Sequence, residues 1–178
     1  MSWRKTDPTN GLMFPYYTEE LLDELINWDM REWRVFEYSG GDSTLWWRDK
    51  CRECISIDTD REWCNSHNLI HIKEKEPFIN YPQQIVQDGG EKFDCIIIDQ
   101  GRTPDGSAFR DETTEVAIQC IKNGGTLIID NWKQNTIPDY GENCWKKSEK
   151  ALINYKSKIY KHPSHQDWKT AVWWIQDR

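Results

Sequence analysis

The sequence predicts an α/β protein with a doubly wound, mainly parallel seven-stranded sheet, helices on both faces and an antiparallel last strand. Three observations support this fold class. Short apolar runs typical of strands alternate along the chain with amphipathic stretches typical of helices. Two glycines directly follow the first apolar run, in the stretch WRVFEYSGGDST at 33–44. The last two runs, 155–161 and 171–175, have no helix between them, so we expect them to pair antiparallel.

Each predicted element has a local reason, taken in chain order. Residues 1–17 are irregular and contain helix breakers, and Thr18 then caps the first helix. The apolar run 93–99 is typical of a central strand covered on both faces, and Gly124-Gly125 turns the chain into the next strand. The predicted strands are 33–38, 54–57, 69–73, 93–99, 126–129, 155–161 and 171–175, and the predicted helices are 18–30, 43–49, 61–66, 81–87, 111–122 and 143–154.

Length and charge limit the class of protein. A chain of 178 residues, 37% of them hydrophobic, fits one domain over 1–178, with a core at 31–178. Residues 1–30 form an N-terminal lid and helix extension, whose aromatic residues either cover a site or, as is commoner, pack against the body. The formal charge of −7 argues against nucleic acid and favours a small-molecule partner. Without a long apolar run or a signal-peptide region, we expect no membrane partner and a cytoplasmic location, whereas the sequence leaves the oligomeric state open.

One cysteine pattern invites a metal interpretation. Cys51, Cys54, Cys64 and His67 have the spacing C-x2-C-x9-C-x2-H, which is typical of a zinc site. The strand predicted between the two pairs would separate them by roughly 15–20 Å at about 3.3 Å per residue. One ion does not bridge that distance, so we favour reduced, mostly buried thiols.

The glycine turn and the acidic strand ends indicate a nucleotide-type site. Gly40 and Gly41 allow a sharp turn from strand to helix, and such a turn presents backbone N–H groups to a ligand. Asp58 ends the second predicted strand about 20 residues later, where a carboxylate holds ribose hydroxyls in Rossmann-like folds. The alternative is that Asp58 or Asp60 caps the next helix, and for Asp60 we favour the cap. Asp99 ends the central strand in the same crevice.

Several motifs, in the same order, resemble those of class I S-adenosylmethionine-dependent methyltransferases, from Arg34 onward. In one group of small methyltransferases the first motif reads like FEYGSGNSTLWW, with DPEW after the next acidic strand end. Here these are FEYSGGDSTLWW and SIDTDREW. The similarity continues through FDCIIID, through Arg110 fifteen residues before Gly125, and through GGTLIIDN and KTAVWW. One departure is Ser39, which stands where the family has its first glycine.

The resemblance implies a Rossmann-like methyltransferase domain that binds S-adenosylmethionine. It assigns the methionine part of the cofactor to Glu37 and the turn 39–41, the ribose to Asp58, and the place beside the reactive sulfonium to Asp99. The adenine subsite stays unassigned. The implied cofactor-binding set is Glu37, Tyr38, Ser39, Gly40, Gly41, Ser43, Asp58 and Asp99.

The resemblance also suggests how the acceptor is deprotonated, with Asp99, Asp130 and Asn131 as the predicted catalytic residues. In cation-dependent O-methyltransferases, an Asp after the fourth strand and an Asp-Asn pair after the fifth bind a divalent metal, so these three residues are candidate ligands of Mg or Ca. Arg102 replaces the lysine of those enzymes and, always protonated, does not act as a base. We therefore favour structural or acceptor-binding roles for the three residues over metal dependence.

The loop 100–110 leaves the central strand at the crevice and is the predicted specificity element. Its residues Arg102 and Arg110 bind an acidic group of the substrate or pair with nearby carboxylates, and both interpretations stay open. Trp132, directly after the Asp-Asn pair, is placed to line an acceptor pocket.

The sequence thus predicts S-adenosylmethionine-dependent methyl transfer to a small-molecule acceptor, with oxygen as the favoured acceptor atom. An alternative from another class is a cofactor-binding or interaction protein that has the methyltransferase fold without turnover. An NAD-dependent oxidoreductase is less favoured, because Ser39, Gly41 and Thr44 occupy the places of the G-x-G-x-x-G glycines.

Overall fold

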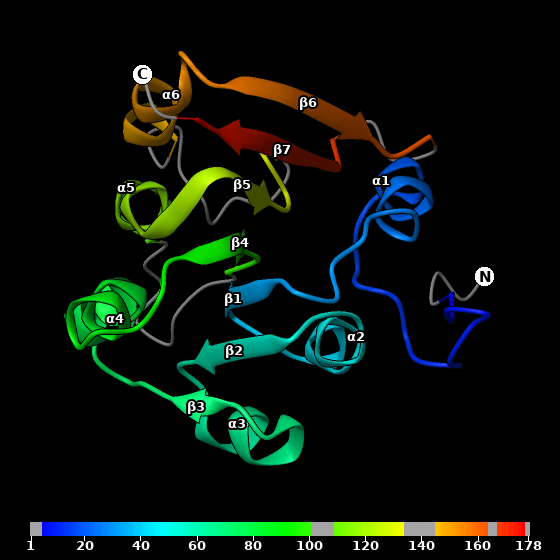
Figure 1. Cartoon of the computed structure of the whole chain (residues 1–178), viewed down its shortest axis with the longest axis horizontal. Coiled ribbons are helices and arrows are strands. Elements are labelled where there is room, and N and C mark those ends of the chain that lie inside the picture. Colours follow the sequence, from blue (N-terminus) through cyan, green and yellow to red (C-terminus); the bar gives the residue numbers. More distant parts are fainter. Residues whose placement is uncertain (1–4, 101–108, 134–144, 164–166, 177–178) are drawn as a thin grey trace.

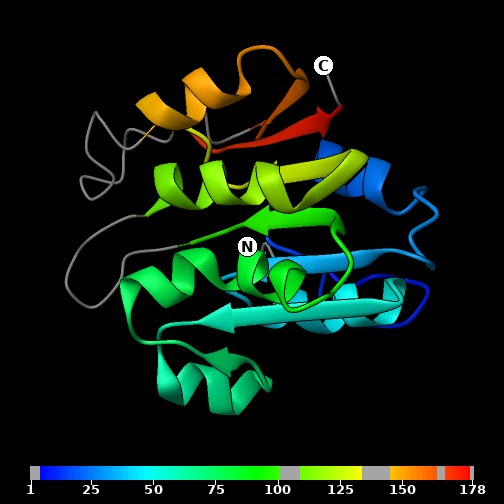
Figure 2. The ribbon, with the colours of Figure 1, turned by 60° about the vertical axis from the view of Figure 1, so that its left-hand side comes forward.

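A computed structural model describes residues 5–100, 109–133, 145–163 and 167–176. Within these ranges, seven strands form one sheet in the order β3-β2-β1-β4-β5-β7-β6. Strand β7 runs antiparallel to both of its neighbours and the other pairings are parallel, as the sequence predicts. Figure 2 shows β7 pointing opposite to β2 and β4. The strands are β1 (Arg34–Tyr38), β2 (Glu53–Asp58), β3 (Ile70–His71), β4 (Phe93–Ile98), β5 (Ile121–Ile129), β6 (Lys156–Lys161) and β7 (Lys169–Ile175).

Helices cover both faces of the sheet. In Figure 1, α4, α5 and α6 lie on one side of the strands, and α1, α2 and α3 lie on the other. The helices are α1 (Glu19–Leu25), α2 (Asp42–Lys50), α3 (Arg61–His67), α4 (Lys75–Gln87), α5 (Arg110–Cys120) and α6 (Lys146–Leu152). No helix among the described residues is long and apolar enough to cross a membrane.

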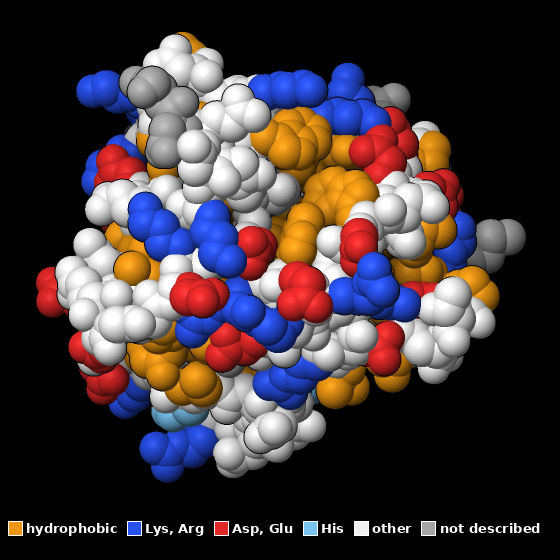
Figure 3. Space-filling view, viewed as in Figure 1, with side chains coloured by type: hydrophobic (Ala, Val, Ile, Leu, Met, Phe, Trp, Pro, Cys, Tyr) orange, Lys and Arg blue, Asp and Glu red, His pale blue; other side chains and the backbone are white. Residues whose placement is uncertain are grey.

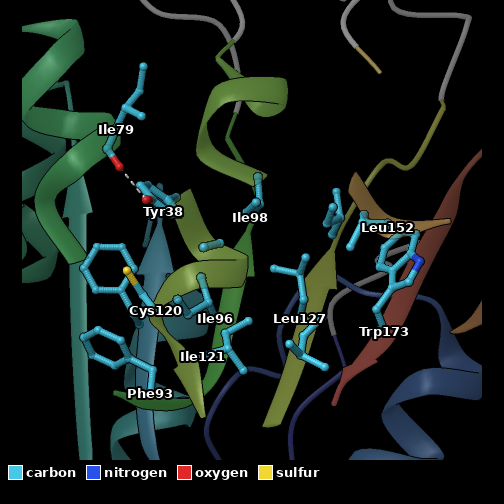
Figure 4. Packing of buried hydrophobic residues seen from close by; sticks show 14 of the residues in the cluster. Tyr38, Ile79, Phe93, Ile96, Ile98, Cys120, Ile121, Leu127, Leu152 and Trp173 are labelled. Atoms are coloured by element: carbon cyan, nitrogen blue, oxygen red, sulfur yellow. Dashed lines mark hydrogen bonds between the residues drawn. The ribbon is translucent and has the colours of Figure 1, made fainter. Parts of the chain in front are cut away.

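The core has two halves, because successive strand residues point to opposite faces of the sheet. Ile96 and Ile98 on β4 pack in the larger cluster, whereas Cys95 and Ile97 belong to the cluster on the other face. Figure 4 shows the larger cluster, in which the Tyr38 hydroxyl donates to the carbonyl oxygen of Ile79 on α4 at 2.7 Å. Strand β4 is thus covered on both sides, which confirms the prediction from its apolar run.

Helix α4 begins six residues before the predicted start. Pro77 and Pro82 favour a loop in the sequence, yet Pro77 lies in the first turn, where a backbone N–H has no helical partner. Phe78, Ile79 and Pro82 are buried, so packing of this face stabilises the helix in spite of the second proline. Helix α1, in contrast, ends at Leu25 and is shorter than predicted.

The boundary between α5 and β5 also differs from the prediction. The strand begins at Ile121 rather than at 126, and the pairing of β4 with β5 shifts register between Phe93 and Cys95. Gly125 lies at this irregularity, where a Cβ atom would stand 2.6 Å from Ile121 Cγ2 and 2.8 Å from the Asp94 carbonyl oxygen. The two glycines therefore permit a bulge within the strand instead of a turn before it.

Charged side chains of both signs are interspersed over the face of the molecule seen in Figure 3. The excess of acidic residues therefore does not gather there into a single acidic patch.

Candidate active site

The turn after β1 contains two glycines, Gly40 and Gly41, whose backbones lie close to neighbouring side chains. At Gly40, a Cβ atom would lie 2.5 Å from Thr44 Oγ1 and 2.9 Å from Glu37 Oε2, so no larger residue fits without displacing them. Helix α2 begins at Asp42, and Thr44 Oγ1 accepts a hydrogen bond from the Gly41 N–H at 2.9 Å. The N-terminus of α2 thus starts directly at the turn.

Glu37 is fully buried beneath this turn and is held by hydroxyl groups from three positions. Its carboxylate accepts hydrogen bonds from Ser43, from Thr44 on α2 and from Ser56 on β2. Burial raises the pKa of Glu37, while the three hydroxyl groups favour the ionised form. Glu37 does not line the cavity described next, so its observed role is to fix the turn and to hold Ser43.

A cavity of about 440 Å³ opens over the turn, a size that suits a cofactor or small ligand. Six of the eight predicted cofactor residues line it together: Ser39, Gly40, Gly41, Ser43, Asp58 and Asp99. The other lining residues are Met13, Phe14, Tyr16, Asp42 and Trp63.

The N-terminal segment forms one wall of this cavity through Met13, Phe14 and Tyr16. Asp7 fixes the segment to α2, because its buried carboxylate accepts from Trp46 Nε1 at 2.9 Å and pairs with Lys50 Nζ at 2.9 Å. The segment therefore both covers the site and packs against the body of the protein.

Trp63 also lines the cavity, a position that the sequence alone does not reveal. Its indole N–H donates to the Gly40 carbonyl oxygen at 2.8 Å. Its ring also packs on Gly41, where a Cβ atom would lie only 2.9 Å from Trp63 Cζ2. The backbone N–H of Trp63 donates to Asp60 Oδ1 at 2.9 Å, which confirms Asp60 as the cap of α3. The available signal was the spacing DREW, which places the tryptophan one helical turn after the cap.

Asp58 lies half-buried at the end of β2 and faces the cavity. Its Oδ1 accepts a hydrogen bond from the Asp60 N–H at 2.8 Å. Burial raises the pKa of Asp58, an effect that hydrogen bonds from Asp60 and Ser39 oppose. Ser39 itself has φ of 60°, the left-handed conformation that favours glycine.

Asp99 and Asp130 follow the neighbouring strands β4 and β5 and act on one another electrostatically. Burial, together with the charge of Asp130, raises the pKa of Asp99 well above its usual range. Burial also raises the pKa of Asp130 to about 6. Such a pair holds a proton to higher pH than an exposed aspartate and can exchange it near neutral pH.

Arg110 joins these two strand ends. It is fully buried, its Nε donates to the Gln100 carbonyl oxygen at 2.9 Å, and its other side donates to the Asp130 carbonyl oxygen. Its positive charge lowers the pKa of both aspartates against the effect of burial. Arg110 thus donates to backbone carbonyl oxygens at this end of the sheet and acts electrostatically on both carboxylates, while a role in binding the substrate stays a prediction.

The described residues contain no group of three or more His, Cys, Asp or Glu side chains that could hold a metal ion. Asp130 Oδ1 already accepts hydrogen bonds from Thr170 Oγ1 and Trp168 Nε1, and the guanidinium of Arg110 supplies positive charge beside both carboxylates. Carboxylate and amide oxygens are of the kind that Mg or Ca binds, but Asp130 Oδ1 is already engaged by these protein donors, and no step below uses a metal.

Several other predicted residues lie elsewhere. Tyr38 points into the core and Trp132 packs edge to face against Trp145 and Trp173 at 4.8 Å, so neither side chain lines the cavity. Asn131 has φ of 53° in the turn after β5. Arg102 lies outside the described residues.

The residues of the zinc-like pattern have other contacts. Cys51 Sγ lies 3.2 Å from the Glu53 carbonyl oxygen, and Cys64 is buried. The His67 ring packs on Trp63 with 3.8 Å between ring centroids. Each of the five described cysteines is free of a disulfide.

No protein-family model and no curated protein matches this sequence. Solved structures share its fold. The O-methyltransferase TomG of Streptomyces achromogenes, in complex with SAM, matches 88% of this chain and 77% of its own with a TM-score of 0.61 at 17% identity. The N-methyltransferase NodS of Bradyrhizobium japonicum matches 89% of this chain over 96% of its own length, with a TM-score of 0.56 at 12% identity. An rRNA methylase from Streptococcus thermophilus matches 84% of this chain over 90% of its own length, with a TM-score of 0.56 at 10% identity.

This chain therefore has the fold of class I S-adenosylmethionine-dependent methyltransferases. The three neighbours differ in the acceptor that their names state, so the choice of acceptor has to be argued from the site.

Proposed function

We propose that this protein transfers the methyl group of S-adenosylmethionine to an oxygen atom of a small molecule. One observation carries the cofactor assignment. Asp42, Asp58 and Asp99 are the only acidic residues among the described lining of the cavity, which contains no lysine or arginine. S-adenosylmethionine carries a positive sulfonium and a positive ammonium group, whereas the pyrophosphate of NAD is negative. An acidic cavity with aromatic walls therefore favours S-adenosylmethionine over NAD.

The residues have separate roles in this proposal. Asp58 binds the ribose hydroxyls, the turn at 39–41 and the start of α2 contact the amino-acid part, and Asp99 lies beside the methyl group. The cofactor supplies an activated methyl carbon when bound. The protein contributes alignment of the acceptor with that carbon, which can be worth roughly 7–11 kcal/mol.

The acceptor atom is inferred from the aspartate pair. A hydroxyl group has to lose a proton as it is methylated, and a general base works best with a pKa near the operating pH. Asp130, with its pKa raised to about 6, meets this condition; it does not itself line the cavity, but it acts electrostatically on Asp99, which does. Since the cavity is acidic, the acceptor is a neutral small molecule rather than an acid or a nucleic acid. We further propose that the reaction takes place in the cytoplasm.

Thermal unfolding with S-adenosylhomocysteine tests the cofactor assignment. At 100 times its dissociation constant, the ligand should stabilise the protein by about 2.7 kcal/mol, or roughly 5–10 °C for a domain of this size. Asp58→Asn should remove most of this shift. Asp60→Asn is the matched control, because it changes the same charge two residues away, asparagine caps a helix well, and Asp60 does not line the cavity.

NAD and Mg²⁺ complete the test. An equal shift with NAD would contradict the assignment, and a further shift with Mg²⁺ would reveal a bound cation. Transfer of a labelled methyl group to a panel of neutral alcohols and phenols, with amines in parallel, then tests the acceptor. Binding of S-adenosylhomocysteine without transfer to any of them would favour a binding protein without turnover.

A further inference from the structure

Asp130 is oriented by two hydrogen-bond donors, one from the start of β7 and one from the residue just before it. Thr170 Oγ1 donates to Asp130 Oδ1, and the Trp168 indole N–H donates to the same oxygen at 3.3 Å. All three side chains are buried or half-buried. The direction of the carboxylate therefore depends on where Thr170 and Trp168 are held.

The N-terminal segment holds Thr170. The backbone N–H of Thr18 donates to Thr170 Oγ1 at 3.4 Å. An amide N–H can only donate, so the Thr170 oxygen accepts from Thr18 and its own single proton remains for Asp130. This contact between residues 152 positions apart thus holds the Thr170 oxygen in place while its proton is donated to Asp130.

The same segment holds Trp168. The ring of Tyr16 stacks on the Trp168 indole with 5.2 Å between centroids and 21° between planes. The ring of His162 also stacks on this indole, at 4.8 Å and 7°. An indole packed in this way has little freedom to rotate away from Asp130.

Between these two contacts, Tyr17 faces the acidic groups of the site. It is buried, as are its neighbours Glu37 and Trp47. Burial, with the charges of Glu37 and Asp99, raises the pKa of Tyr17, so its hydroxyl stays neutral. Three consecutive residues of the N-terminal segment therefore lie against the groups that surround Asp99 and Asp130.

We propose that Tyr16 and Thr18 are positioning residues, which orient the carboxylate of Asp130 toward the methyl acceptor through Trp168 and Thr170. The proposal rests on the proposed function, in which Asp130 receives the acceptor proton. It makes the N-terminal segment, which carries none of the methyltransferase motifs, part of the apparatus that orients this group.

Two matched pairs of variants separate this role from ordinary packing. Thr170→Val removes the donor to Asp130 with little change in shape, whereas Thr170→Ser keeps it. Thr18 has φ of −63°, the value that a proline ring imposes, so Thr18→Pro is compatible with the backbone and replaces the N–H with a ring carbon that faces Thr170 Oγ1, which breaks this contact. Thr18→Ala removes the side-chain hydroxyl alone, which has no partner among the described residues, and keeps the N–H.

The first readout needs neither cofactor nor acceptor. The indole N–H signal of Trp168, assigned with Trp168→Phe, reports its hydrogen bond to Asp130 in a ¹⁵N NMR spectrum. Thr170→Val and Thr18→Pro should move this signal and speed its exchange with water by about 5- to 10-fold, as expected for one weakened hydrogen bond. Thr170→Ser, Thr18→Ala and Thr126→Val, a buried strand threonine away from Asp130, should leave it unchanged. An unmoved signal in Thr170→Val, or equal effects within both pairs, would overturn the proposal.

The second readout is methyl transfer. Thr170 and Thr18 do not line the cofactor cavity, so Thr170→Val should lower kcat about 10-fold, as expected for the loss of a hydrogen bond to a charged group, while the KM for S-adenosylmethionine stays the same. Thr170→Ser should restore most of kcat. A parallel loss of S-adenosylhomocysteine affinity would overturn a positioning role. If the wild type transfers no methyl group to any acceptor, the proposed function fails, and the NMR readout still decides whether this segment orients Asp130.

Discussion

The indole N–H of Trp63 and the carbonyl oxygen of Gly40 form a 2.8 Å hydrogen bond that ties α3 to the turn after β1. The bond places the six-membered ring of Trp63 against the Gly41 backbone, 2.9 Å from the position of a Cβ atom. Helix α3, capped by Asp60, thereby sets the width of the cavity on the side of Asp58.

This contact predicts a coupled pair of substitutions. Gly41 has an extended φ of 174°, so an alanine there is opposed by the Trp63 ring and not by backbone strain. Gly41→Ala should lower affinity for S-adenosylhomocysteine by about 10-fold, and the same change in a Trp63→Ala background should cost much less, since contacting residues couple by roughly 0.5–3 kcal/mol. Isothermal titration calorimetry of the four proteins measures the coupling. Additive losses would contradict the contact.

Ser39 predicts a difference between two small substitutions. A residue other than glycine with φ near 60° carries a cost of roughly 1–2 kcal/mol, which Ser39→Ala keeps and Ser39→Gly removes. Both variants lose the hydroxyl group that favours ionised Asp58. The glycine variant also has a more flexible unfolded chain, which offsets part of this gain. We therefore expect the free energy of unfolding of Ser39→Gly to be about 1 kcal/mol higher than that of Ser39→Ala. Urea unfolding measures this difference, and equal stability would mean that the turn is unstrained.

Arg110 is expected to be essential for stability. Arg110→Met leaves the carbonyl oxygens of Gln100 and Asp130 without its N–H donors and removes the positive charge beside the carboxylates of buried Asp130 and half-buried Asp99. The loss in unfolding free energy should be about 3–5 kcal/mol in urea at pH 7. Arg52→Met is the control, because the Arg52 pair with Glu91 is exposed and should cost less than about 1 kcal/mol. Comparable losses in the two variants would contradict this role.

Asp130 predicts an unusual dependence of stability on pH. Its pKa rises from the usual 3.8 to about 6 in the folded protein, so between these values the folded state holds a proton that the unfolded chain has released. The stability from this group is full below pH 3.8 and is lost as the pH rises through 6. Relative to the wild type, Asp130→Asn should therefore gain stability between pH 4.5 and pH 7. Urea unfolding of both proteins at the two pH values checks the sign, and a constant difference would contradict it.

Much of this architecture follows from local patterns that the sequence displays. The apolar run at 93–98 predicts a strand covered on both faces, and the acidic strand ends predict that Asp58 and Asp99 reach one crevice. Asp60 caps α3 as expected. These inferences succeed because strand period, caps and the shared edge of parallel strands depend on neighbouring residues and on topology.

The features that the sequence does not reveal depend on packing between distant segments. Trp63 becomes a wall of the cavity only because α3 packs against the turn, and Trp132 joins Trp145 and Trp173 in the core although its neighbours are polar. Helix α4 forms across two prolines because buried contacts outweigh their local cost.

The order of the last strands also determines when their part of the sheet can form during synthesis. Strand β7 lies between β5 and β6, although it is made after both. Until residues 169–175 leave the ribosome, β5 has an open edge and β6 has no place in the sheet. The N–H of Thr18, made more than 150 residues earlier, finds Thr170 only at that moment. The hydrogen bonds that Asp130 accepts from Thr170 and Trp168 therefore form only after β7 has been made.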